Sequence, residues 1–207
     1  MTRLGTLNPS PQPVPWSLYV VRHGRTALNV DDRYLGALDP PLDELGLEQA
    51  AALARLLQGR ASAVVCSSRL RAVQTAEILA SAWHLPFRIV HEFAERDVGV
   101  YEGLTKEEAR LRYPGLWEQD ITRRWEIGPP GGESIEAVFD RVAAGLRLLG
   151  RDCAGHEIVL VAHGFVAKVI RALWTGLSWD DFFRYALKNG QVEHYPCPQV
   201  ATPARPR

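Results

Sequence analysis

Two stretches of the sequence join an apolar run to a histidine and a glycine. YVVRHG ends at Gly24 and LVAHG ends at Gly164, so His23 and His163 each follow a strand-like run. A lone histidine at such a position is ordinarily a hydrogen-bonded core residue, but an imidazole can also act as a nucleophile or a base near neutral pH. The glycine permits a tight turn, and backbone amides at the start of a following helix can bind an anion. The paired pattern therefore predicts two imidazoles that face one anionic ligand.

Arginines surround the same positions. Arg22 and Arg25 flank His23, while Arg69 and Arg71 begin the helical pattern in CSSRLRAVQTA. Planar guanidinium groups match the oxygens of phosphate. Arg22 adjoins a buried strand and needs a partner there, whereas an arginine such as Arg69 in a first helical turn is ordinarily solvated. The pattern favours a local site for a phosphate group.

The elements that would carry these residues alternate between strand and helix. Apolar, β-branched runs predict buried strands at residues 17–21, 61–67, 86–90 and 157–162. Helical spacing predicts helices at residues 45–57, 70–83 and 134–149, the last with Ser134 as its N-cap and Gly150 at its end. This alternation predicts an α/β fold, a three-layer sandwich with a mostly parallel central sheet. Ligands bind such sheets at the carboxyl ends of the strands.

One domain accounts for most of the 207 residues. Proline-rich segments predict tails at residues 1–16 and 196–207, which leaves a single domain at 17–195. Residues 96–133 interrupt the alternation with a short helix near 105–113 and the turn-rich GPPGGES. We expect this segment to cover a ligand like a lid. Its aromatic residues suggest an organic group beside the phosphate: Tyr101, Trp117 and Trp125.

Charge and cysteine content exclude several classes of protein. The 24 basic and 24 acidic side chains cancel, so no overall field attracts nucleic acid or an anionic membrane. Cys66, Cys153 and Cys197 are too few and too widely spaced for a disulfide framework or a zinc knuckle. No segment has the apolar length of a signal peptide or a membrane span. We therefore expect a cytoplasmic protein that binds neither nucleic acid nor membrane.

A series of motifs, in order, resembles the histidine phosphatase superfamily, which includes the cofactor-dependent phosphoglycerate mutases and many small phosphatases. The motifs are RHGRTALN (22–29), GALDPPLDELGLEQA (36–50), SSRLRAVQTA (67–76), EFAERDVGVYEG (92–103), PPGGES (129–134) and VAHG (161–164). RHG alone arises by chance, whereas the ordered set is specific. The resemblance implies a phosphoglycerate mutase-like fold and a phosphatase that needs neither a metal nor a cofactor.

The resemblance gives each matching residue a role. His23 would attack the phosphorus and carry the phosphoryl group as phosphohistidine. Arg22, Arg71 and His163 would hold the phosphoryl oxygens, and the two arginines would keep His23 unprotonated. Glu95 would protonate the leaving oxygen and later activate water.

Further residues near the RHG and VAHG motifs are expected to contact the substrate. Asn29 would support the phosphate pocket, while Thr26 either joins it or only caps the following segment. Arg25 would add positive charge at the mouth of the pocket. Gly24 and Gly164 would let the backbone turn and approach the ligand.

Three other functions stay open on the sequence. A mutase would return the phosphoryl group to a bound sugar acid; Val98 occupies the position where the mutases carry Tyr, which favours a hydrolase. Two alternatives stay open for three basic residues, Lys106, Arg123 and Arg124. They loosely match positions at which the mutases bind their substrate, or they lie on a solvated surface. A catalytically inactive scaffold should have lost residues such as His23, and a metallohydrolase would need ligand clusters such as HxH, which are absent from the sequence. The expected partner is a small phosphorylated substrate, with a homodimer as a further possibility.

Overall fold

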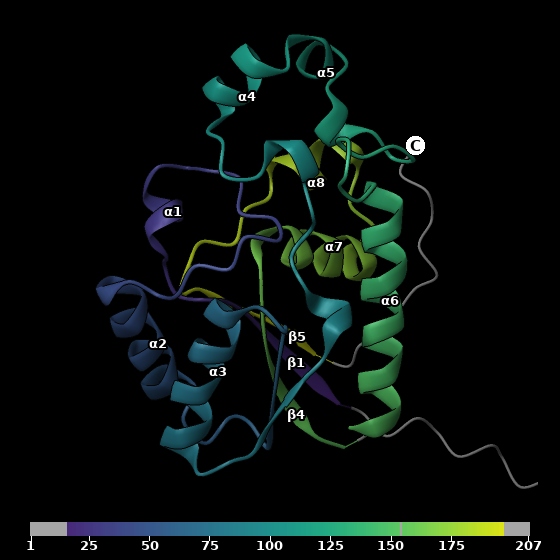
Figure 1. Cartoon of the computed structure of the whole chain (residues 1–207). Coiled ribbons are helices and arrows are strands. Elements are labelled where there is room, and N and C mark those ends of the chain that lie inside the picture. Colours follow the sequence, from purple (N-terminus) through teal and green to yellow (C-terminus); the bar gives the residue numbers. More distant parts are fainter. Residues whose placement is uncertain (1–15, 154, 197–207) are drawn as a thin grey trace, which may run out of the picture.

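Five strands form one central sheet in the order β3-β2-β4-β1-β5 (Figure 1). The computed structural model describes residues 16–153 and 155–196. The strands are β1 (Ser17–Arg22), β2 (Ala63–Cys66), β3 (Phe87–Ile89), β4 (Glu157–Ala162) and β5 (Val192–Pro196). The first four run parallel to their neighbours, and β5 pairs antiparallel with β1. The predicted mostly parallel sheet is confirmed.

Helices cover both faces of this sheet. The helices of the described residues are α1 (Ala27–Val30), α2 (Glu44–Leu56), α3 (Leu70–Trp83), α4 (Lys106–Arg112), α5 (Pro114–Glu118), α6 (Ile135–Asp152), α7 (Gly164–Thr175) and α8 (Trp179–Arg184), of which α2, α3, α6 and α7 pack on the sheet. Because side chains of a strand alternate between faces, Leu18 and Val20 of β1 pack with α6 and α7, whereas Tyr19 and Val21 pack with α2 and α3. Figure 1 shows α2 and α3 on one side and α6 on the other. The three-layer sandwich is thus confirmed.

The register of β1 and β4 brings the two His-Gly pairs together. Arg22 lies opposite Ala162, so His23 and His163 are the next residues at the carboxyl ends of adjacent parallel strands. The His23 amide donates to the Ala162 carbonyl at 3.0 Å. The two imidazole centroids are 5.1 Å apart. The prediction that both imidazoles lie at one edge of the sheet is confirmed.

Residues 96–133 form a wall with a small core of its own. Val98, Tyr101, Ala109 and Ile121 are buried together. Single 3-10 turns (Gly99–Tyr101 and Ile121–Arg123) flank α4 and α5, which lie together at one end of the molecule in Figure 1. This internal packing gives the segment a defined shape beside the sheet edge.

Three sequence expectations need correction. Helix α6 does not end at Gly150 but runs on to Asp152, and Gly150 lies against Trp16, whose indole would be about 3.5 Å from an added Cβ. Trp16, placed in the tail, is 8% exposed and belongs to the main core, and Pro196 is the last residue of β5. The rest of the predicted tails lies outside the described residues. Strand β5 was not predicted.

The predicted N-cap of α6 is confirmed, since the Ser134 hydroxyl accepts the Ala137 amide at 3.1 Å. Trp125, which the sequence placed with Tyr101 and Trp117 beside the ligand, instead packs against the main core, with its ring centroid 5.0 Å from that of Phe139, and does not line the cavity of the candidate site. None of the helices within the described ranges is long and apolar enough to cross a membrane.

Candidate active site

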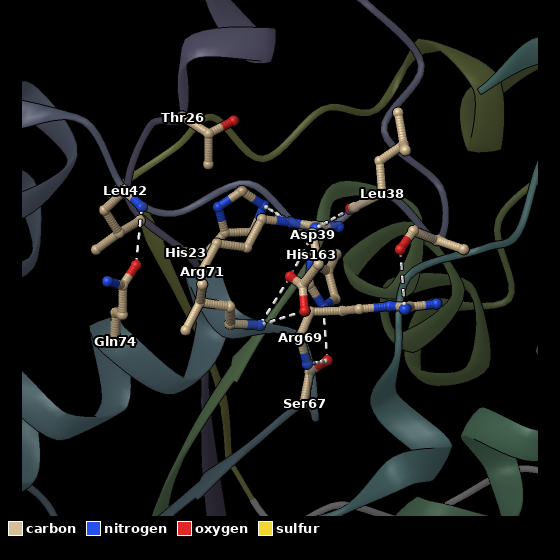
Figure 2. A network of polar contacts seen from close by, with 12 residues as sticks. His23, Thr26, Leu38, Asp39, Leu42, Ser67, Arg69, Arg71, Gln74 and His163 are labelled. Atoms are coloured by element: carbon tan, nitrogen blue, oxygen red, sulfur yellow. Dashed lines mark hydrogen bonds and ion pairs between the residues drawn. The ribbon is translucent and has the colours of Figure 1, made fainter. Parts of the chain in front are cut away.

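His23 follows β1 at the carboxyl edge of the sheet. It is 2% exposed, and its Nδ1 lies 2.6 Å from the Gly24 carbonyl oxygen. A carbonyl only accepts hydrogen bonds, so Nδ1 carries the proton and Nε2 keeps the lone pair. The Arg71 Nε group points at that lone pair from 3.3 Å (Figure 2). The arrangement leaves a nitrogen that can attack an electrophile.

The pKa of His23 lies well below its ordinary value. Burial is the largest cause, followed by the charges of Arg71 and Arg22, while the hydrogen bond to Gly24 acts in the opposite direction. The same burial and the nearby arginines also lower the pKa of His163 well below normal. Both imidazoles are therefore neutral near pH 7, as nucleophilic chemistry at nitrogen requires.

Three buried nitrogen atoms around these imidazoles have no hydrogen-bond partner within the described part of the chain: Arg22 Nε, Arg71 Nη2 and His163 Nδ1. One terminal nitrogen of each arginine is held by a backbone carbonyl: Arg22 Nη1 donates to the Leu187 carbonyl at 2.9 Å and Arg71 Nη1 to the Leu38 carbonyl at 2.8 Å. Buried charges without partners are costly, and an anion between them would remove that cost. The cluster can therefore hold the oxygens of a phosphoryl group.

Ser67, which the sequence analysis did not single out, supports His163. It is the first residue after β2, is fully buried, and its hydroxyl lies 2.7 Å from His163 Nε2 (Figure 2). The same oxygen accepts the Arg69 amide at 3.2 Å. The hydroxyl satisfies Nε2 and leaves Nδ1 directed at the cluster. Its place at the carboxyl end of a strand was the available signal.

Glu95 lies at the other side of the cluster. Its Oε1 accepts the Arg96 amide at 3.0 Å, and its Oε2 accepts the Phe165 amide of α7 at 3.3 Å. It lines the same cavity as Arg22 and Gly164. Glu92 and Glu102, two carboxylates nearby in the sequence, do not line this cavity, and Glu102 accepts the Ala37 amide. Of Glu92, Glu95 and Glu102, Glu95 is the one placed to exchange a proton with a ligand.

Asn29 and Thr26 are joined by hydrogen bonds. The side-chain oxygen Oδ1 of Asn29 accepts hydrogen bonds from both the Thr26 amide at 3.1 Å and the Thr26 hydroxyl at 3.0 Å. Asn29 lines the cavity, but Thr26 is fully buried and does not. The geometry thus gives Thr26 the capping contact that the sequence offered as its alternative.

Asn189 is a second residue that sequence reasoning missed. Its amide nitrogen lies 3.1 Å from the His23 carbonyl, 3.4 Å from the Gly24 carbonyl and 3.3 Å from Asn29 Oδ1. It therefore ties the loop before β5 to the loop after β1. No local pattern marks it, because its partners are about 160 residues away in the sequence.

Arg25 turns away from the cluster. Its Nε pairs with Asp43 at 2.7 Å, beside the start of α2, and it does not line the cavity. Gly24 packs against the same helix, since a Cβ on it would lie 2.3 Å from the Gly46 carbonyl oxygen. Gly164, in contrast, lines the cavity and lets the Arg22 guanidinium approach, with its carbon 3.3 Å from where a Cβ would be.

A cavity of about 900 Å³ is lined by Arg22, Glu95 and Gly164 and extends along residues of the 96–133 segment. His23, Arg71 and His163 do not line it. Its aromatic lining comprises Tyr34, Tyr101, Trp117, Phe165 and Phe183. Lys106 and Arg123 also line it, whereas Arg124 donates to the Gln119 carbonyl and does not. The described residues contain no group of three or more His, Cys, Asp or Glu side chains that could hold a metal ion.

A sheet edge with a neutral imidazole and unpaired arginine donors is typical of proteins that bind phosphoryl groups, and comparison with known proteins gives the family. Residues 18–197 match the model of the histidine phosphatase superfamily (branch 1). The chain belongs to this superfamily.

Individual relatives agree with this assignment. A bifunctional protein of Mycobacterium tuberculosis is 37% identical over 164 residues, or 77% of this chain, and the chain spans only 44% of that protein. The glucosyl-3-phosphoglycerate phosphatase of Mycolicibacterium vanbaalenii is 35% identical over 176 residues, which cover 80% of this chain and 76% of that protein. A mycobacterial glucosyl-3-phosphoglycerate phosphatase, solved in complex with VO3, superposes with a TM-score of 0.77 at 29% identity and covers 86% of this chain and 90% of that one.

Proposed function

We propose that this chain hydrolyses phosphomonoesters without a metal ion, through a phosphohistidine on His23. The observation that carries the proposal is the His23 Nε2 lone pair, which faces a cluster of arginine and histidine donors without partners. The domain would comprise at least residues 16–196, since Trp16 belongs to the main core and Pro196 to β5, with residues 96–133 as the substrate wall.

In the first step, His23 Nε2 attacks the phosphorus and the bond to the leaving oxygen breaks. Arg22, Arg71 and His163 hold the equatorial oxygens while charge develops on them. Glu95 gives its proton to the leaving oxygen, so that an alcohol departs and the carboxylate is left ionised.

In the second step, Glu95 takes a proton from a water molecule as that water attacks the phosphohistidine. The phosphorus–nitrogen bond breaks, Nε2 recovers its lone pair and inorganic phosphate leaves. The enzyme returns to its starting protonation state, with the imidazole neutral because its pKa is low.

Two further observations support this proposal. Two of the relatives are named as phosphatases that act on glucosyl-3-phosphoglycerate. A cavity of about 900 Å³ suits a small phosphorylated substrate. We also propose a cytoplasmic location, because free thiols such as those of Cys66 and Cys153 are typical of a reducing compartment. A homodimer stays a prediction.

The test measures phosphate release from p-nitrophenyl phosphate in excess EDTA. Wild type should turn over, and His23→Ala should lose both turnover and the acid-labile phosphoenzyme. His91→Ala removes an exposed imidazole outside the cavity lining and serves as the matched control. Glu95→Gln should slow substrates with poor leaving groups most.

Several outcomes would contradict the proposal. Loss of activity in EDTA would indicate a metal-dependent reaction. Full activity of His23→Ala would remove the mechanism, and bisphosphoglycerate-stimulated isomerisation of 3-phosphoglycerate without phosphate release would identify a mutase.

A further inference from the structure

The backbone of residues 22–25, which we call the nucleophile loop, is bound along its whole length by distant segments. Its amides donate, in order, to the Gln191 carbonyl at 3.0 Å, the Ala162 carbonyl at 3.0 Å, the Thr75 hydroxyl at 3.1 Å and Gln49 Oε1 at 2.9 Å. Its carbonyls also have partners, and one of these is the side-chain amide of Asn189. Two side-chain amides, of Gln49 and Asn189, thus contact the loop that carries His23.

The peptide unit that joins Gly24 to Arg25 is held at both of its polar ends. Gln49 Oε1 of α2 accepts the Arg25 amide at 2.9 Å. Asn189 Nδ2, which precedes β5, lies 3.4 Å from the Gly24 carbonyl oxygen. Because a peptide unit is planar and its N–H and C=O point in opposite directions, fixing both groups fixes the rotation of the unit. Gly24 has no Cβ that would restrict this rotation by itself.

The rotation of this peptide unit decides where the Gly24 carbonyl points. Its oxygen lies 2.6 Å from His23 Nδ1, whose proton it accepts. The same hydrogen bond turns the ring so that Nε2 faces Arg71. If the peptide were turned over, an N–H group would face the Nδ1 proton, and two donors would oppose each other. The orientation of the His23 ring therefore depends on the Gly24–Arg25 peptide.

Asn189 contacts the nucleophile loop as a donor. Its Nδ2 lies 3.1 Å from the His23 carbonyl and 3.3 Å from Asn29 Oδ1, in addition to the Gly24 carbonyl. All three neighbours are oxygens that only accept hydrogen bonds, so the NH2 group faces them. His23 Nδ1, 3.4 Å away, carries a proton itself and is a second donor to the Gly24 carbonyl.

The segments that carry Gln49 and Asn189 pack against each other. Gly190 directly follows Asn189, has a φ of +69°, and would place an added Cβ 2.8 Å from the Gln49 Cβ. Its amide lies 3.1 Å from the Arg22 carbonyl and 3.3 Å from the His23 carbonyl. A side chain at position 190 would therefore push Gln49 and the nucleophile loop apart.

We propose that Gln49 and Asn189 are positioning residues of the phosphoryl transfer. Together they hold the Gly24–Arg25 peptide, and through its carbonyl they keep the His23 ring turned with Nε2 toward the phosphorus. This inference rests on the proposed phosphatase function. Gln49 does not line the cavity, so it acts through the Arg25 amide and not through the substrate. The two residues set the rate at which Nε2 attacks and leave the binding of phosphate to the arginines.

The first experiment compares two variants of Gln49. Gln49→Leu has a similar size and no acceptor, whereas Gln49→Glu keeps an oxygen that can accept the Arg25 amide. Gln49→Leu should lower the single-turnover rate of phosphoenzyme formation from p-nitrophenyl phosphate by about 10- to 100-fold, the effect of a misplaced reacting group. Gln49→Glu should keep most of the rate. The inhibition constant of inorganic phosphate should stay within about twofold in both variants.

A spectroscopic measurement reports on the ring without turnover. In ¹⁵N-histidine-labelled protein, the Nδ1 proton of His23 should resonate far downfield, because it lies in a short buried hydrogen bond. His23→Gln identifies this resonance by its loss. Gln49→Leu should move it upfield or broaden it, and Gln49→Glu should leave it in place.

Variants of Asn189 test the other end of the peptide. Asn189→Asp keeps the shape and removes the donor, and Asn189→Leu removes all polar atoms. Both should lower the rate of phosphoenzyme formation and move the Nδ1 proton resonance. Gln58→Leu changes an exposed glutamine beyond the end of α2 and should leave the rate and the resonance unchanged.

Three outcomes would overturn the positioning role. One is a wild-type rate in Gln49→Leu and in Asn189→Asp. Another is a lower rate with an unchanged Nδ1 proton resonance, which would separate the loss from the ring. The third is a Gln49→Glu variant as slow as Gln49→Leu, which would show that the acceptor is not what matters. Absence of a phosphoenzyme in wild type would instead refute the proposed function, and the resonance would still report whether the two amides hold the ring.

Discussion

The Arg71 Nε group lies 3.3 Å from His23 Nε2, so a guanidinium of α3 donates to the imidazole that directly follows β1. This contact requires an unprotonated nitrogen, because a protonated Nε2 would place two donors against each other. Arg71 thus acts on His23 in two ways: it orients the ring, and its charge lowers the pKa of the ring.

We expect Arg71→Met to reduce kcat/KM by about 10²- to 10³-fold, the usual effect of removing one donor to developing charge. It should also raise the pKa of His23 toward the ordinary value, since Arg71 is the larger of the two charges that lower it. The acid limb of the pH–rate profile should therefore move to higher pH. An acid limb identical to that of wild type would show that Arg71 does not control this protonation.

Stability should fall on acidification because His23 and His163 are buried as neutral rings. Their folded pKa values lie below the unfolded value of about 6.5. Above pH 6.5 both states are neutral; as pH falls from there toward the folded pKa, only the unfolded chain binds protons. The free energy of unfolding should drop by up to about 1.4 kcal/mol per pH unit for each histidine. Urea unfolding between pH 7 and 5 measures this, and His163→Asn should show a shallower slope than wild type.

Ser67→Ala would leave the buried Nε2 of His163 without its hydroxyl partner. We expect a loss of about 1–3 kcal/mol in the free energy of unfolding, the cost of an unsatisfied buried polar group, together with a lower kcat/KM. Ser68→Ala is the matched control, because the adjacent hydroxyl is half-buried and lies outside the cluster. Equal stability and activity of the two variants would mean that His163 needs no support from Ser67.

Gly24→Ala should be strongly destabilising. The added Cβ would lie 2.3 Å from the Gly46 carbonyl oxygen, a backbone atom that cannot move without shifting α2. We expect a loss above about 3 kcal/mol, as for severe overpacking. Gly115→Ala in α5 has open space at the Cβ position and should be neutral or stabilising by up to about 1 kcal/mol through helix propensity. Thermal unfolding of both variants gives the comparison.

The sequence predicts well those parts of the structure that depend on local patterns. The apolar runs predicted β1 and β4. The His-Gly pairs at the ends of these strands predicted that His23 and His163 lie close together. Strand β5 was not predicted, because VEHYP mixes charged, aromatic and proline residues. An antiparallel edge strand tolerates such residues and a buried strand does not.

The supporting contacts depend on distant segments and were largely invisible in the sequence. Asn189 meets His23 across 166 residues, and the pairing of Arg25 with Asp43 follows from how α2 docks beside the loop after β1. Helix α6 continues past Gly150, which lies against Trp16, and no helix-end rule takes such a distant contact into account. The catalytic roles assigned to the site residues stay predictions.

The strand order has a consequence for biosynthesis. Of the five described strands of this sheet, β1 is translated first, yet its two neighbours in the sheet, β4 and β5, are translated last. The backbone of β1 therefore lacks the strands with which it forms hydrogen bonds until almost the whole domain has been translated. Such long-range pairing slows folding and leaves an apolar strand exposed to association in the meantime. We therefore expect nascent chains that stop before β4 to depend on chaperones to stay unaggregated.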